Sequence, residues 1–472
     1  MKTKNTYFDN SLEKFIIIIG EVFGYDFLKQ NLILRDANGR LTLVLKGDGS
    51  DLGKIKHLKE KIADEIMPYV DPGYSVCTAE DIYDIELEEL ELDDKTQRFL
   101  GVNNELIAYH FFERRIIGGD WQRYYSDYTG PVRIVFSSIK GGVGRSTALC
   151  VAASSLARSG KRVLAIDLDL EAPGLGNMLL TDDTLPKFGL IDYFLEKNLG
   201  NVTDGFIVDM IGSSWLSYGK GRIDIIPAIG KSSLNNPENV LGKLSRAYLP
   251  GSDESGNQLT FMDNLRDLID TIDYKRYDVV LIDSRAGLHE TSAAALVGLG
   301  AEVLCFGVDQ SQTIQGYKLL FAAINNNYYA NHANVNWVER LQFIHAKASI
   351  DKNKQNIFNE KISDLISEYF FNENKSIESN FHVEELSDTF DVSWHDDLYN
   401  EEINKIITDE SSTIPRLANV ISILNDERYD EFDPLSDKSS LNEEVYNATF
   451  GPLISRIHEI VEESLSNRYE LK

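Results

Sequence analysis

The chain has 472 residues, more than one hydrophobic core normally supports, so we expect two domains or one domain with a large appendage. Hydrophobic residues make up 43% and charged residues 26%, which is ordinary globular usage and excludes a disordered or fibrous polypeptide. The 47 basic and 75 acidic residues give a formal net charge of −28, which disfavours broad binding to nucleic acids or to anionic membrane surfaces.

The cysteines and the apolar runs indicate a cytoplasmic protein. Cys77, Cys150 and Cys305 are widely spaced and form no C-x-x-C pair, as in proteins of reducing compartments. The apolar run Phe15–Ile19 is far shorter than the roughly 20 residues that a transmembrane helix needs. We therefore expect neither a spanning segment nor a targeting segment.

Residues 1–128 predict a smaller α+β domain at the N-terminus. Residues 31–46 alternate apolar and polar side chains around the turn signal Asp36–Gly39, which favours a hairpin. Helical spacing follows over residues 52–70. The stretch Glu80–Asp94 holds nine acidic residues and no basic residue, which indicates a solvated face or an edge for a partner.

Residues 129–472 predict a second domain with alternating strands and helices. An apolar strand at 132–136 is followed by a Gly-rich turn and a helix at 148–156, which Gly160 caps. Further strands are expected at Val163–Ile166, Ile223–Pro227, Val279–Ile282, Val303–Val308 and Leu341–Ile344, with helices near 262–273, 290–299 and 313–327. Continuously apolar strands separated by helices predict an α/β fold with a mostly parallel, doubly wound sheet.

Two parts of this domain depart from simple alternation. Residues 181–262 are too long for one crossover and predict insertions that decorate the sheet. After residue 350 the pattern is mostly helical and acidic, and it ends in an amphipathic stretch from Phe450 to Leu465. That stretch is acidic where a membrane-binding helix would be basic, so we expect it to pack on the sheet.

The segment Ser138–Thr147 carries the chemistry, because it lies between a predicted strand and a predicted helix. Its glycines allow backbone N–H groups to surround phosphate oxygens, and the helix N-terminus adds a favourable dipole. The ordinary P-loop pattern has Gly at 139 and Lys at 145, whereas this chain has Ile139 and Arg145 and an extra Lys140 before the glycines. The flanking strand and helix disfavour the alternative of a tight turn without a ligand.

This Lys-Gly-Gly-x-Gly segment, followed by a basic residue and Ser-Thr, resembles the deviant Walker A motif of the MinD/ParA family of ATPases. Ala165–Asp169 resembles the end of that family's switch I strand, and Asp278–Gly287 resembles Walker B with switch II. Ile223–Ala228 fits the strand between them. The resemblance covers roughly residues 131–310 and implies a sheet of the P-loop NTPase type.

The resemblance implies ATP and Mg²⁺ as cofactors and assigns roles to single residues. Lys140 would reach the partner's phosphates in a dimer that encloses the nucleotide, Asp169 would orient the attacking water, and Asp283 would hold the metal through its water shell. Ser146 would bind Mg²⁺ through its hydroxyl, so the implied metal site comprises Ser146, Asp169 and Asp283. The implied nucleotide contacts are Gly141, Gly142, Val143, Gly144, Arg145, Ser146, Thr147 and Gly287.

Simpler interpretations stay open for several of these residues. Asp283 could cap the following helix, and Asp167 admits a structural role as well as a catalytic one. Arg285 could approach the terminal phosphate, although an ordinary surface arginine is the simpler interpretation. The scattered histidines show no metal-ligand spacing, so we expect no metal beyond the Mg²⁺ of the nucleotide.

We therefore expect an ATPase that forms a homodimer on ATP binding and signals to an unidentified protein partner, in a signalling or defence-type system. Because the guanidinium of Arg145 is bulkier than an ammonium, binding should survive while turnover stays open. One alternative is a nucleotide-dependent scaffold that does not hydrolyse ATP. Another is a ParA-like DNA partition ATPase, which would bind random duplex at low salt.

Overall fold

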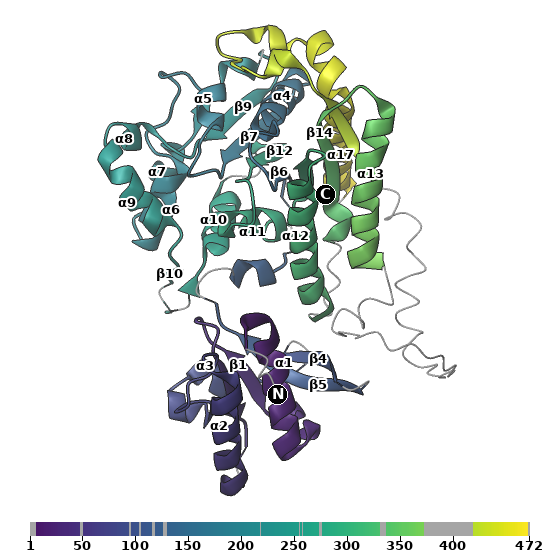
Figure 1. Ribbon diagram of the computed structural model, residues 1–472. Helices are drawn as coiled ribbons and strands as arrows, with labels where there is room; N and C mark the ends of the chain where they lie inside the picture. Colours follow the sequence, from purple (N-terminus) through teal and green to yellow (C-terminus); the bar gives the residue numbers. More distant parts are fainter. Residues whose placement is uncertain are drawn as a thin grey trace. The chain divides into compact units, whose positions relative to one another are not determined.

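The computed structural model (Figure 1) describes residues 6–47, 51–93, 96–102, 105–115, 119–125, 130–217, 219–253, 255–256, 258–272, 276–330, 337–371 and 419–470. The chain divides into two compact units. The first comprises Met1–Gly119 in its main part, and the second begins at Asp120.

The first unit is an α+β fold around a mixed sheet. Its strands are β1 (Leu32–Arg35), β2 (Leu41–Leu45), β3 (Val76–Thr78), β4 (Gln97–Val102) and β5 (Glu105–Glu113), in the order β3-β2-β1-β5-β4. Helices α1 (Phe8–Phe23) and α2 (Leu52–Ile66) pack against each other and share one apolar core with the sheet. The predicted hairpin is confirmed, since β1 and β2 are antiparallel and Gly39 in their turn has a φ of 86°.

The acidic stretch of this unit is partly folded into it. The short helix α3 (Ile85–Glu89) buries Leu87 in a second, smaller apolar cluster. Arg114 pairs with Asp84 at 2.7 Å and with Glu86 at 2.9 Å. These ion pairs neutralise part of the acidic charge close to the sheet.

The second unit contains an eight-stranded sheet, as expected of a mostly parallel α/β fold. Its strands are β6 (Val132–Ser138), β7 (Arg162–Asp167), β8 (Gly212–Ser213), β9 (Arg222–Ile226), β12 (Val279–Asp283), β13 (Glu302–Gly307), β14 (Leu341–Ala348) and β15 (Ile421–Leu424), in the order β15-β14-β13-β6-β12-β7-β9-β8. Every neighbouring pair is parallel except β8 with β9. The central strands β6 and β12 therefore end side by side, which is where parallel sheets place their sites.

Helices cover both faces of this sheet, so the doubly wound prediction is confirmed. On one face, α4 (Arg145–Arg158) packs against β6, β7 and β12, and α17 (Glu443–Glu470) packs on α4 and β15. On the other, α11 (Glu290–Val297) contacts β6 and α10 (Phe261–Thr271), while α13 (Lys352–Ile366) contacts β14. Helix α12 (Ser311–Ala330), also labelled in Figure 1, follows β13 in the chain.

The C-terminal amphipathic stretch packs as predicted. Leu453, Ile457 and Val461 of α17 are fully buried in the core that also holds the apolar face of α4. Ser155 of α4 and His458 of α17 are hydrogen-bonded at 2.9 Å. The region after residue 350 was expected to be mostly helical, and within it β15 adds a parallel strand at the sheet edge that was not predicted.

The predicted insertions between residues 181 and 262 form a small layer of their own. They comprise α6 (Leu190–Asn198), α7 (Asp204–Val208), α8 (Lys231–Leu234), α9 (Val240–Ala247) and the strands β10 (Gly251–Ser252) and β11 (Gln258–Leu259), apart from β8 and β9 of the main sheet. Helices α6 and α9 pack together, and Lys243 donates to the buried Asp192 at 2.5 Å. The layer leads directly into α10.

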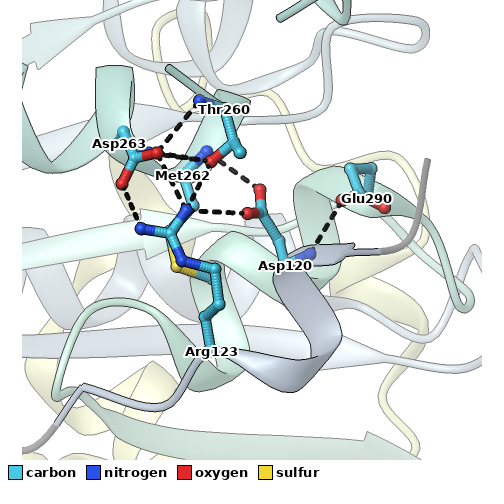
Figure 2. A network of polar contacts seen from close by, with 6 residues as sticks. All are labelled: Asp120, Arg123, Thr260, Met262, Asp263 and Glu290. Atoms are coloured by element: carbon cyan, nitrogen blue, oxygen red, sulfur yellow. Dashed lines mark hydrogen bonds and ion pairs between the residues drawn. The ribbon is translucent and has the colours of Figure 1, made fainter. Parts of the chain in front are cut away.

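A polar cluster that the sequence analysis did not predict fixes the start of α10. Figure 2 shows its members, hereafter the α10 clamp: Asp120, Arg123, Thr260, Met262, Asp263 and Glu290. Asp120 is fully buried and accepts the Met262 N–H at 3.1 Å. Arg123 donates to both carboxylate oxygens of Asp263, at 2.8 and 2.6 Å, and Asp263 also accepts the backbone N–H of Thr260 at 3.0 Å. The clamp therefore holds residues 120–123 against the N-terminus of α10 and, through Glu290, against α11.

Candidate nucleotide-binding site

The loop between β6 and α4 forms an open backbone cradle. Gly142 and Gly144 have φ values of 73° and 89°, a region that glycine adopts without strain. A Cβ added at Gly141, Gly142 or Gly144 would meet no atom within 4 Å, so the loop faces open space. Because α4 begins at Arg145, its unpaired N–H groups face the same side, as a phosphate site requires.

Ser146 and Asp283 meet beside this cradle. The Ser146 hydroxyl donates to Oδ2 of Asp283, the last residue of β12. Asp283 is 2% exposed, and its Oδ1 is buried without a hydrogen-bond partner. The hydroxyl and the carboxylate that were expected to hold Mg²⁺ therefore lie in direct contact, with one carboxylate oxygen left over.

Asp167 ends β7 directly alongside Asp283 and is fully buried. Its carboxylate accepts the N–H groups of Asp169, Gly174 and Leu175 at 3.1 to 3.2 Å, so it anchors the loop after β7. Burial, and then the charge of Asp283, raises the pKa of Asp167 to about 8. Burial also raises the pKa of Asp283 to about 6, against the opposing charge of Arg145. Two buried carboxylates side by side with raised pKa values favour the binding of a cation between or beside them.

Arg145 faces this acidic group from the start of α4. It is 7% exposed, and its Nη2 lies 3.6 Å from Oδ2 of Asp169. Its Nη1 is buried without a hydrogen-bond partner. Burial raises the pKa of Asp169, which Arg145 opposes. The guanidinium is therefore held inside the cradle by a distant ion pair and keeps a donor for another acceptor.

The remaining predicted residues surround the loop. Lys140 donates through Nζ to Oε1 of Gln310 at 2.6 Å, just before α12. The N–H of Gly287 donates to the Ser138 carbonyl at 2.9 Å, which ties the segment after β12 to the end of β6. Val143 is buried at 4% exposure. Gly144 and Thr147 line a small pocket on the side of the C-terminal elements.

That pocket brings together residues that the sequence analysis did not name. From the segment after β15 come Asn425, Asp426 and Tyr429, and from α17 come Thr449 and Phe450. Lys347, at a bulge of β14, completes the wall with a φ of 51°. These residues lie about 200 to 300 positions from the glycine loop in the chain, so no local pattern could connect them to it.

Another group missed by the sequence analysis lies beyond Asp169. Oε1 of Glu171 accepts from the guanidinium of Arg285 and from the hydroxyl of Tyr248. Its Oε2 is buried without a hydrogen-bond partner. Arg285 was noted in the sequence, but its partners Glu171 and Tyr248 carried no recognisable signal there.

The residues present fit a nucleotide with its Mg²⁺. Over the described ranges, no group of three or more His, Cys, Asp or Glu residues could hold a metal ion alone. Ser146 offers an oxygen ligand and Asp283 a carboxylate for the water shell, and Mg²⁺ commonly takes few protein ligands and completes its shell with phosphates and waters. The unpartnered atoms of Arg145 and Asp283 are of opposite charge, as a magnesium phosphate requires.

Comparison with known proteins gives two findings. Residues 132–337 match a family model described as an AAA domain. A search of curated proteins found no match. Among the described helices, none combines the length and apolarity that crossing a membrane takes.

Similar solved structures include a plasmid partition protein, a septum site-determining protein and a ParA bound to DNA. A plasmid partition protein from Borrelia burgdorferi is 20% identical, over 49% of this chain and 85% of that chain, with a TM-score of 0.32. The septum site-determining protein MinD from Pyrococcus horikoshii OT3, complexed with Mg-ADP, is 20% identical, over 48% and 77%, with a TM-score of 0.32. The ParA of pNOB8 bound to nonspecific DNA is 16% identical, over 71% and 99%, with a TM-score of 0.39.

The matched family segment begins at β6 and contains both the glycine loop and the end of β12. It has the parallel sheet and the order of motifs that the sequence analysis expected. Residues 132–337 thus match the AAA domain model, and the motifs within them resemble those of the MinD/ParA ATPases.

Proposed function

We propose that the second unit binds ATP together with Mg²⁺ in the cradle between β6 and α4. The observation that carries this proposal is the pair of unpartnered buried atoms, Nη1 of Arg145 and Oδ1 of Asp283. A buried polar atom without a partner costs free energy of about 1 to 3 kcal/mol. Phosphate oxygens would satisfy the guanidinium, and a hydrated cation would satisfy the carboxylate.

Each residue of the cradle then has a role. Backbone N–H groups of Gly141 to Thr147 surround the phosphates, and Arg145 donates to them. The Ser146 hydroxyl binds Mg²⁺, while Asp283 and Asp169 hold its water shell. When bound, the metal neutralises phosphate charge during phosphoryl transfer. The pocket beside Thr147, between Asn425 and Tyr429, takes the base of the nucleotide.

Titration calorimetry with ATP and Mg²⁺ tests this binding. Ser146→Ala should weaken binding at least tenfold, because it removes a metal ligand. Ser159→Ala is the matched control, since Ser159 is exposed at the opposite end of α4 and should bind like the wild type. No heat of binding with the wild type would overturn the proposal.

We extend the proposal to hydrolysis, with Asp169 orienting the attacking water. Its raised pKa, caused by burial, brings this carboxylate closer to the range in which a side chain can exchange a proton near neutral pH. Gly287, hydrogen-bonded to Ser138, would keep the segment after β12 close to the terminal phosphate. Steady-state phosphate release above that of Asp169→Ala is the expected result.

The ion pair between Arg145 and Asp169 favours a second candidate, a scaffold that binds ATP without hydrolysing it. An arginine is always charged, so Asp169 stays engaged as long as the guanidinium remains beside it. In that case ATP binds with normal affinity, while phosphate release does not exceed that of Asp169→Ala. The same two measurements therefore separate the candidates.

We further propose that ATP binding closes a homodimer, which then signals to a protein partner, as in signalling or defence-type systems. The support is Lys140, which is partly exposed and donates to Gln310 rather than to a residue of the cradle. A lysine in this place can leave Gln310 for a phosphate of a second copy. Mass in solution should double with ATP but not with ADP, and Lys140→Ala should abolish the difference.

A further inference from the structure

The segment after β12 has a fixed backbone and an exchangeable side chain. The Arg285 carbonyl accepts the hydroxyls of Ser284 and Ser292 at 3.3 and 3.2 Å. Gly287, two residues on, is tied to Ser138 at the end of β6. The side chain of Arg285 nevertheless stays 30% exposed. Its guanidinium can therefore change partner without a change in the path of the backbone.

Glu171 is the present partner of that guanidinium, and it lies at the rim of the cradle. It follows Asp169 by two residues, and Asp169 in turn lies 3.6 Å from Arg145. Glu171 uses one carboxylate oxygen for both Arg285 and Tyr248, while the other oxygen is buried without a partner. The charge of Arg285 is thus held beside the cradle by a carboxylate whose own hydrogen bonding is incomplete.

We propose that Arg285 senses the terminal phosphate: Glu171 holds its guanidinium in the nucleotide-free protein, and the terminal phosphate of ATP takes it over. This inference rests on the proposed nucleotide binding. A phosphate offers the arginine fork a stronger and more highly charged acceptor than a carboxylate does. ADP ends one phosphate earlier, so it leaves Arg285 with Glu171.

The exchange also reaches the insertion layer through Tyr248. This residue ends α9, donates its hydroxyl to Glu171, and packs its ring edge-on against His289 at 5.1 Å. Burial, and then the hydrogen bond to Glu171, raises the pKa of Tyr248, so the phenol remains a neutral donor. When the guanidinium of Arg285 moves to the phosphate, Tyr248 is the remaining described partner of Glu171. The loss of the positive charge beside Glu171 then affects the insertion layer through this hydrogen bond.

Calorimetry with ATP and with ADP, both with Mg²⁺, tests the inference through the ratio of the two affinities. Arg285→Gln should weaken ATP binding about tenfold or more, because it loses a charge-assisted contact, and should leave ADP binding within about twofold. Arg285→Lys should restore part of the ratio, since it keeps the charge but not the fork. Glu171→Gln should strengthen ATP binding about threefold, because the competing charge is gone.

Arg246→Gln is the matched control, since Arg246 is an exposed arginine of α9 and should leave the ratio unchanged. Far-ultraviolet circular dichroism shows whether each variant is folded, and Arg285→Lys replaces Arg285→Gln if the latter is not. Equal loss of ATP and ADP affinity, or no loss of either, would overturn the role of Arg285. Absence of binding of both nucleotides to the wild type would instead overturn the proposed function.

Discussion

The second unit contains two clusters of buried charge that differ in how completely they are paired. In the α10 clamp, Asp120 and Asp263 receive backbone and side-chain hydrogen bonds, and Arg123 donates to both oxygens of Asp263. Among the described residues with a buried, unpartnered side-chain atom, none belongs to the clamp. The cluster around the cradle contributes three such atoms, on Arg145, Glu171 and Asp283.

The pKa shifts follow this division at Asp263 but not at Asp120, because burial raises the pKa of Asp120 as it does those of the cradle carboxylates. Burial acts to raise the pKa of Asp263, yet the hydrogen bonds from Arg123 and Thr260 hold it below its usual value. Around the cradle burial prevails, and the pKa values of Asp167, Asp169 and Asp283 are all raised. A cluster whose hydrogen bonds and charges are paired within the protein stabilises the fold. A cluster whose buried groups are paired only when a ligand binds destabilises the ligand-free fold.

The largest effect on this comparison should come from breaking the clamp. Asp120→Ala removes the acceptor of the Met262 N–H and leaves Arg123 with Asp263 alone among its carboxylate partners. We expect the free energy of unfolding to fall by about 3 kcal/mol, because buried donors lose their partners. Chemical denaturation measures this loss.

Glu238→Ala provides the control for that measurement. Glu238 is exposed, and its removal should change the free energy of unfolding by less than about 0.5 kcal/mol. A loss of the same small size with Asp120→Ala would show that the clamp does not stabilise the fold.

Asp283→Asn should act in the opposite direction in the cradle. At pH 8 it removes a buried charge beside Asp167, so the ligand-free variant should be more stable than the wild type. Saturation with ATP and Mg²⁺ at a hundredfold excess over the dissociation constant should stabilise the wild type by about 2.7 kcal/mol. The variant should gain less than about 1 kcal/mol by the same linkage. Equal gains in thermal unfolding experiments would contradict the assignment of Asp283.

The pH dependence of that stability difference sharpens the comparison further. The raised pKa values mean that Asp167 and Asp283 keep protons in the folded state that the unfolded chain has released. The free energy of unfolding of the wild type should therefore fall, relative to that of Asp283→Asn, as the pH rises from about 4 to about 8. Between pH 5 and pH 8 this relative loss should amount to about 2 kcal/mol. Half-buried histidines with lowered pKa values, such as His289, contribute equally to both chains and cancel.

If the stability difference between the wild type and Asp283→Asn stays constant over this pH range, burial does not raise the pKa of Asp283. Unfolding curves in denaturant at pH 5, 6, 7 and 8, without nucleotide, give the comparison. With saturating ATP and Mg²⁺ the wild-type loss should shrink, because the cation balances both carboxylates.

The smallest effect on stability should come from Arg145→Lys, within about 1 kcal/mol, since the positive charge is kept. Its effect on turnover is the informative one. A compact ammonium should hold Asp169 less firmly than the guanidinium does, so phosphate release should rise. Unchanged or slower release would show that the pair with Asp169 does not limit hydrolysis.

The sequence predicted the strands of the second unit well where long apolar runs are bounded by turn residues. The ends of β6, β7 and β12 lie within two residues of the expected positions, and α4 follows the glycines as expected. The strand β15 escaped prediction because its four residues lie in a region of helical pattern. Residues 372–418, which were expected to be helical, lie outside the described residues.

The candidate site likewise contains contacts that the sequence could predict and contacts that it could not. Ser146 and Asp283 could be expected to meet, because Asp283 ends β12, Ser146 follows the loop after β6, and a parallel sheet brings these two strand ends together. Glu171 and Tyr248 are 77 positions apart, and Asp120 and Met262 are 142 apart. Hydrogen bonds over such separations depend on side-chain placement, which periodicity and local motifs do not contain.

The packing of α17 on α4 has a consequence for the order of events during synthesis. The glycine loop and α4 leave the ribosome about 300 residues before Leu453, Ile457 and Val461, which cover the apolar face of α4. Until α17 has been made, α4 exposes to solvent or to chaperones apolar residues that are buried in the folded protein, such as Leu149 and Leu156. We therefore expect the nascent chain to form a stable cradle only once α17 has been made, and a chain shortened before α17 to be prone to aggregation.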